Sequence, residues 1–89
     1  MKLSFPNPSR SFDATSNRVC FWAYDSTIEI AFYVEVGALK RLFPDLSEAE
    51  ADFLRAFDDA RDRIYEVADK VYIHGSKRAL AIVLAANNF

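Results

Sequence analysis

The stretch IEIAFYVEV, residues 28–36, is the clearest strand signal in the chain. Every second residue is apolar and bulky, which is the period that places side chains on one face of a β-strand. The apolar positions are Ile28, Ile30, Phe32, Val34 and Val36. The alternate positions include two glutamates, so we expect the other face to be partly exposed to water.

Two β-rich segments precede this strand. Residues 11–14 and 18–24 flank Thr15-Ser16-Asn17, whose short polar side chains suit a turn. A second turn is predicted at residues 25–27, so the first half of the chain reads as three meandering strands. Residues 1–10 contain two of the three prolines, and we expect them to form an extended N-terminal arm.

The second half of the chain has helical periodicity. Residues 38–43 predict a short helix that stops ahead of Pro44. The sequence Ser47-Glu48-Ala49-Glu50 is a capping box, so it predicts the start of a long helix that runs to about Ile73 and closes at Gly75. One apolar stripe should follow this helix, formed by Phe53, Phe57, Ala60, Ile64, Ala68 and Val71.

A short run that is apolar on both faces, residues 78–86, predicts a last strand. Strands that precede helices, instead of alternating with them, indicate the α+β class. We expect an antiparallel sheet of about four strands, in the order β-β-β-α-α-β, with both helices packed on one face. A chain of 89 residues has room for one core, so we expect a single domain over residues 1–89.

Charge and cysteine content restrict the partners and the compartment. The net charge is −2 with both signs interspersed, which gives no field that attracts nucleic acid or an anionic membrane. The single cysteine and the lack of a long apolar segment predict a cytoplasmic protein without a membrane partner.

Five residues of the predicted long helix are spaced three or four positions apart: Phe57, Arg61, Ile64, Ala68 and Tyr72. This series resembles the pattern of the bacterial domain-of-unknown-function family 1488. Phe12-Asp13, followed by Val19, Phe21 and Ala23, resembles the family's opening hairpin, and Ala38-Leu39 resembles its first helix. The resemblance covers roughly residues 5–73 and implies a small bacterial α+β protein whose activity is not established.

We identify no catalytic residue, metal site or cofactor site. Cys20 is in the middle of a strand among apolar neighbours, where a thiol behaves as a small hydrophobe, and His74 at a helix end complements the helix dipole. Four acids of the long helix stand three or four residues before a base, which is typical of a solvated face: Asp52–Arg55, Asp58–Arg61, Asp59–Arg63 and Glu66–Lys70. The chain also lacks a glycine-rich phosphate loop.

Arg61 and Tyr65 are the candidate ligand-binding residues. Arg61 lies one turn after Phe57 and close to the apolar stripe, and with Arg63, Lys77 and Arg78 it could contribute to an anion site. The alternative, which we favour, is that an internal carboxylate or a strand-end carbonyl satisfies this arginine.

Aromatic side chains suggest an interaction surface. Trp22, Tyr24 and Tyr33 should lie with Val83 on the sheet face away from the helices. A platform for nucleic-acid bases would need basic flanks, and the acidic flanks here favour a protein interface. We therefore expect a homodimer or larger assembly that buries this face, with the N-terminal arm as a competing cover through Leu3 and Phe5.

These observations lead to two functional hypotheses. The first is a non-catalytic binding or interaction module that self-associates and has an unidentified protein partner. The alternative is a small accessory enzyme or an anion- or small-ligand-binding domain that uses a cleft beside the long helix around Arg61. A dimeric nucleic-acid-binding regulator ranks third, because the charge balance and the absence of a helix-turn-helix signal weigh against it.

Overall fold

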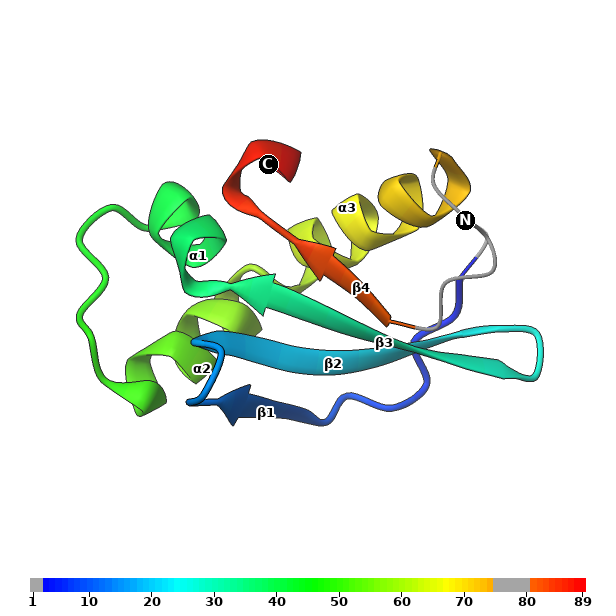
Figure 1. Cartoon of the computed structure of the whole chain (residues 1–89), viewed down its shortest axis with the longest axis horizontal. Helices are drawn as coiled ribbons and strands as arrows, with labels where there is room; N and C mark the ends of the chain where they lie inside the picture. The colour runs from blue at the N-terminus through cyan, green and yellow to red at the C-terminus, as the bar shows by residue number, and fades with distance from the viewer. Residues whose placement is uncertain (1–2, 75–80) are drawn as a thin grey trace.

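A computed structural model describes residues 3–74 and 81–89 and arranges them as a four-stranded sheet with three helices (Figure 1). The elements are β1 (Arg10–Asp13), β2 (Arg18–Asp25), β3 (Ile28–Glu35), α1 (Val36–Leu42), α2 (Glu50–Asp59), α3 (Arg61–His74), β4 (Ala81–Leu84) and the 3-10 turn η1 (Ala86–Asn88). The predicted α+β class is confirmed. None of the described helices is long and apolar enough to cross a membrane.

The sheet has the strand order β1-β2-β3-β4 and is mixed. The pairs β1/β2 and β2/β3 are antiparallel, whereas β4 runs parallel to β3. The prediction of a fully antiparallel sheet is therefore wrong for the last pair. The parallel pairing follows from the path of the chain between β3 and β4. This connection contains all three helices and brings the chain back to the end of the sheet where β3 begins, as in a crossover connection (Figure 1).

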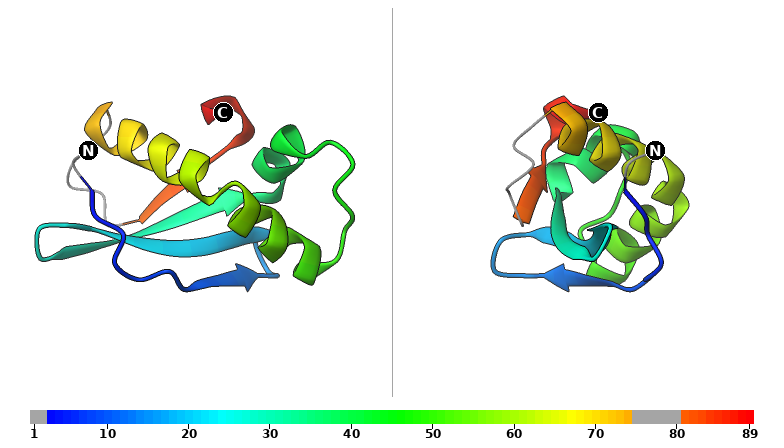
Figure 2. Two further views of the ribbon diagram at one scale, coloured as in Figure 1. Left: turned by 180° about the vertical axis from the view of Figure 1, so that it is seen from behind. Right: turned by 90° about the vertical axis from the view of Figure 1, so that its right-hand side faces the viewer.

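Helices α2 and α3 cover one face of the sheet, as the views from behind and from the side show (Figure 2). Helix α1 follows β3 directly and stands at the end of that strand (Figure 1). No described element lies over the opposite face, which we call the open face. Two hairpin turns link the antiparallel strands, with left-handed backbone at Asn17 (φ 55°) and Ser26 (φ 60°).

The alternation of β3 is confirmed over most of its length. Ile30, Phe32 and Val34 are buried beneath the helices. Ile28 is 53% exposed, so its predicted place in the core is wrong. The reason is that the β2–β3 hairpin extends beyond the helices, so the apolar face has no cover at its tip (Figure 2).

The predicted long helix is two helices that meet at Ala60, where the backbone leaves helical geometry (φ −104°, ψ 13°). The predicted capping box at Ser47 does not form, because Ala49 is the N-cap of α2 and makes no side-chain cap. The Ser47 hydroxyl donates instead to the carboxylate of Asp52. The apolar stripe survives the break, with four members buried: Phe53, Phe57, Ile64 and Ala68.

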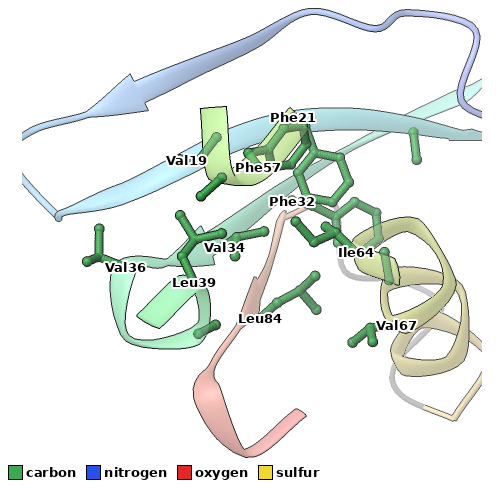
Figure 3. Packing of buried hydrophobic residues seen from close by; sticks show 14 of the residues in the cluster. Val19, Phe21, Phe32, Val34, Val36, Leu39, Phe57, Ile64, Val67 and Leu84 are labelled. Carbon is green, nitrogen blue, oxygen red and sulfur yellow. The ribbon is translucent and has the colours of Figure 1, made fainter. Parts of the chain in front are cut away.

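Side chains from β2, β3, β4 and the three α-helices form a single core (Figure 3), and Phe12 of β1 packs against it. At its centre the ring centroid of Phe21 lies 5.3 Å from that of Phe32 and 5.2 Å from that of Phe57. Leu39 of α1 and Leu84 of β4 close the core at its end.

Part of the predicted C-terminal region lies outside the described residues. This applies to the helix end at Gly75, the turn at 75–77 and the start of the last strand at 78–80. Within the described part, the last strand is Ala81–Leu84, and Ala86 already belongs to η1.

We expect the substitution Phe57→Ala to lower the free energy of unfolding by about 3–5 kcal/mol, because Phe57 is fully buried and its loss opens a large cavity. Urea denaturation measures this change. Ile73→Ala is the matched control, since Ile73 lies on α3 with 41% of its surface exposed. A loss below about 1 kcal/mol for Phe57→Ala would show that the stripe faces water.

Candidate functional site

The described part of the N-terminal arm, residues 3–9, packs on the helix side of the sheet. The backbone N–H of Leu3 donates to Asp69 Oδ1 of α3 at 2.9 Å. The ring of Phe5 stacks on that of Tyr65, with centroids 3.9 Å apart and planes 9° apart. The expectation that Leu3 and Phe5 cover the open face is therefore wrong, because Leu3 is buried in the core and Phe5 stacks on Tyr65 of α3.

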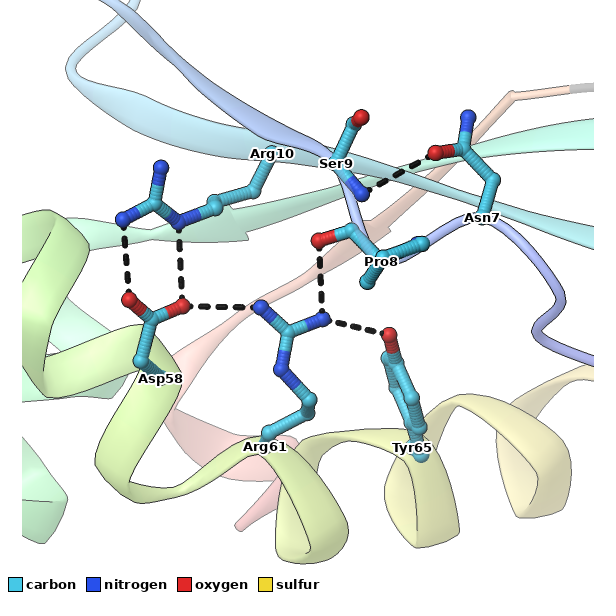
Figure 4. A network of polar contacts seen from close by, with 7 residues as sticks. All are labelled: Asn7, Pro8, Ser9, Arg10, Asp58, Arg61 and Tyr65. Atoms are coloured by element: carbon cyan, nitrogen blue, oxygen red, sulfur yellow. Dashed lines mark hydrogen bonds and ion pairs between the residues drawn. The ribbon is translucent and has the colours of Figure 1, made fainter.

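Arg61 and Tyr65 do meet, one turn apart on α3 (Figure 4). Nη1 of Arg61 donates to the Tyr65 hydroxyl oxygen at 2.7 Å and to the backbone carbonyl of Pro8 at 3.0 Å. Nη2 donates to Asp58 Oδ1 at 2.8 Å. A carboxylate of the same chain thus satisfies Arg61, as the favoured alternative expected, but the carbonyl belongs to the N-terminal arm and not to a strand end. These contacts make Arg61 a clamp on the arm.

Asp58 is the centre of this clamp (Figure 4). Arg10 at the start of β1 donates to both carboxylate oxygens, from Nε at 3.0 Å and from Nη2 at 2.8 Å. The hydrogen bond from Arg10, reinforced by Arg61, lowers the pKa of Asp58 below its usual value. One carboxylate at the end of α2 therefore ties the arm and β1 to the α2–α3 junction.

The remaining basic residues of the predicted anion site do not join Arg61 within the described part of the chain. Arg63 pairs with Glu66 at 3.3 Å and not with Asp59, so the predicted Asp59–Arg63 pair is wrong. Lys77 and Arg78 lie outside the described residues. The other three predicted pairs form, at 3.8 Å for Asp52–Arg55, 2.8 Å for Asp58–Arg61 and 3.4 Å for Glu66–Lys70. The described residues contain no group of three or more metal-ligating side chains.

The open face carries the four predicted interface residues, as the strand register shows. Tyr33 pairs with Cys20 on one side and Val83 on the other, and Ala31 pairs with Trp22 and Ala81. These two central rows are aromatic or small and apolar. Charged residues lie at the ends of the strands: Arg18 opposite Glu35, and Glu29 opposite Tyr24.

The side chains of this face are partly covered by one another. The guanidinium of Arg18 lies over the Tyr33 ring at 3.9 Å and pairs with Asp13 at 3.2 Å. Trp22, Tyr24 and Tyr33 are half-buried, whereas Val83 is 45% exposed. The structure thus places the predicted residues together on one face, and their role as an interface stays a prediction.

Cys20 lies beneath this layer and is 8% exposed. Burial raises the pKa of its thiol, and the nearby charge of Arg18 opposes that shift only in part. The side chain of His74 lies outside the described residues. The surroundings of Cys20 therefore keep it as a neutral thiol near pH 7.

Two surface hollows were not foreseen from the sequence. One, of about 510 Å³, lies between the α1–α2 connection and the flank of α2. The other, of about 490 Å³, lies beside the arm and the β2–β3 turn. Neither is lined by Arg61 or Tyr65. The run Leu42-Phe43-Pro44-Asp45-Leu46, in which four apolar residues surround one aspartate at the end of the predicted short helix, was the signal in the sequence for the first hollow.

We expect Cys20 to react slowly with a thiol reagent in the folded protein at pH 7 and rapidly after unfolding in urea, because burial protects it and disfavours thiolate. Absorbance-monitored labelling with a disulfide reagent measures both rates. Rapid labelling of the folded protein, lost on His74→Ala, would contradict this and point to a reactive dyad.

We expect the Asp58 clamp to make stability depend on acid pH. The folded-state pKa of Asp58 is lowered, so its contribution is present above the unfolded pKa of about 3.9 and is lost as pH falls through the folded pKa. Asp58→Asn should therefore cost about 0.5–1 kcal/mol at pH 7, as exposed ion pairs do, and less at pH 2, where a larger share of the Asp58 carboxyl is protonated.

Urea unfolding at both pH values measures this difference. Asp13 also has a lowered pKa, mainly through a hydrogen bond from the backbone of Ser16, but it is present in both proteins and cancels. An equal cost at pH 7 and pH 2 would show that Asp58 acts without its charge.

Comparison with known proteins supports this architecture. The fold is similar to the crystal structure of a protein of unknown function of the DUF1488 family from Shewanella loihica PV-4. The two share 18% sequence identity over 90% of each chain, with a TM-score of 0.76, so the likeness concerns the fold alone. No curated protein matches the chain.

The family model described as "Protein of unknown function (DUF1488)" matches residues 3–84, which include every described strand and all three α-helices. The resemblance noted in the hairpin and the long helix is confirmed by this match. The chain therefore belongs to the DUF1488 family.

Proposed function

We propose that this protein is a non-catalytic interaction module that self-associates through the open face of its sheet. The observation that supports this most directly is the pair of central rows on that face, which hold Trp22, Tyr33 and Val83 with no described element over them. Apolar surface of this kind marks interaction sites on soluble domains. The single cysteine supports a reducing compartment, the cytoplasm.

The layout of the open face suits a second copy of the same chain. Its centre is apolar and aromatic while its charges lie at the two ends of the strands, which is the core-and-rim anatomy of protein interfaces. A two-fold axis in the plane between two such faces, parallel to the strands and between β2 and β3, sets Arg18 of one copy over Glu35 of the other. The same patch then complements itself, as a two-fold interface requires.

The internal contacts of the candidate catalytic and ligand-binding residues support a non-catalytic role. The guanidinium of Arg61 donates hydrogen bonds to Pro8, Asp58 and Tyr65. Arg61 lines neither of the two hollows described above. Cys20 has a raised pKa and little exposure. No observation favours the anion-binding or enzymatic alternative around Arg61.

We expect the wild-type protein to have twice its chain mass of 10.1 kDa in light scattering at micromolar concentration, and Trp22→Asp to be monomeric. A buried charge without a partner on each side of a two-fold interface disfavours association. Val83→Asp tests the same face at a more exposed position, so we expect it to lower the stability of the fold less than Trp22→Asp does.

Ile73→Asp is the matched control, because it places the same charge on an exposed apolar residue of α3, away from the open face. Circular dichroism confirms that each variant is folded. A monomeric wild-type mass, or a dimer that persists in folded Trp22→Asp and Val83→Asp, would overturn the proposal.

A further inference from the structure

The hollow of about 510 Å³ beside α2 lies apart from the surfaces described so far. The chain leaves α1 in a long connection before it enters α2 (Figure 1). The residues that line the hollow belong to this connection and to α2. It is lined by parts of residues 42–47 and 52–59. None of the lining residues belongs to the open face or to the contact between Arg61 and Tyr65.

The floor of the hollow is apolar. Leu42, Phe43 and Leu46 are half-buried, so each leaves part of its side chain accessible, and the buried Ala56 closes the bottom. Phe43 and Leu46 also pack against the main core, which holds the floor in place. Contact of another apolar side chain with such a floor is favourable in free energy, because the contact removes apolar surface from water.

The rim of the hollow is acidic. The carboxylate of Asp52 has two internal partners, because it accepts a hydrogen bond from the Ser47 hydroxyl and forms an ion pair with Arg55 at 3.8 Å. The side chains of Asp45 and Asp59 are exposed and make no ion pair or hydrogen bond with another described residue. Three lining carboxylates face a single lining base, so the rim has a surplus of negative charge.

We propose that this hollow docks a partner protein through a segment in which a large apolar side chain is flanked by lysine or arginine. The apolar residue would fill the floor while its basic neighbours pair with Asp45 and Asp59. The hollow is open to solvent and not enclosed, so it suits one side chain of a macromolecule better than a small molecule, which needs to be largely surrounded. The acidic rim also disfavours nucleic acid.

The test titrates the ¹⁵N-labelled protein with a synthetic amphipathic peptide of leucine and lysine and follows backbone amide shifts. We expect shifts confined to residues 42–47 and 52–59, and no comparable shifts with a peptide of leucine and glutamate. The double substitution Asp45→Lys/Asp59→Lys should weaken binding at least tenfold, or about 1.4 kcal/mol.

The matched control is Glu50→Lys/Asp62→Lys, which changes the net charge equally at two exposed acids outside the hollow's lining and the open face, whose side chains have no partner among the described residues. Equal weakening by both double variants would reduce the effect to unspecific charge attraction and overturn the proposal. Shifts elsewhere, or no shift at millimolar peptide, would also overturn it. The oligomeric mass is measured separately, so failure here is distinct from failure of the proposed self-association.

Discussion

The contact between Phe21 and the helices holds the molecule together. The ring of Phe21 lies 5.3 Å from Phe32, 5.2 Å from Phe57 and 5.7 Å from Tyr65, measured between centroids, so one side chain joins β2, β3, α2 and α3. Tyr65 in turn stacks on Phe5, which extends the aromatic cluster to the N-terminal arm. Because both helices and the arm gather on this face, none of the described elements is left to cover the other.

Local patterns predicted the elements well and their assembly less well. Alternation identified the buried face of β3 through Ile30 and Val34, since strand geometry alone decides which side chains share a face. It could not show that the face ends before Ile28, because that depends on where the distant helices stop. The direction of β4 likewise depends on the path of the whole crossover, and no glycine or proline marks the helix break at Ala60.

The same distinction applies to the candidate site. Arg61 and Tyr65 are neighbours on one helix, so their contact follows from a spacing of four residues. The contacts of Arg61 with Pro8 and of Asp58 with Arg10 join residues 53 and 48 positions apart, which no periodic pattern encodes. The open face was predictable because period two assigns its residues, whereas the hollow beside α2 depends on the course of an irregular connection.

The two proposed contacts use different surfaces, and this has a consequence for how they combine. Pairing of two open faces leaves the helices of each copy on the outside, so the hollows beside both α2 helices stay accessible. A dimer then offers two equivalent acidic hollows at a fixed separation. A partner with two basic amphipathic segments, joined by a linker that spans this separation, binds the second hollow at a high effective concentration, so its avidity exceeds that of either segment alone. In this proposal, self-association of the sheet face and weak binding at the hollow would thus reinforce one another without any change in either site.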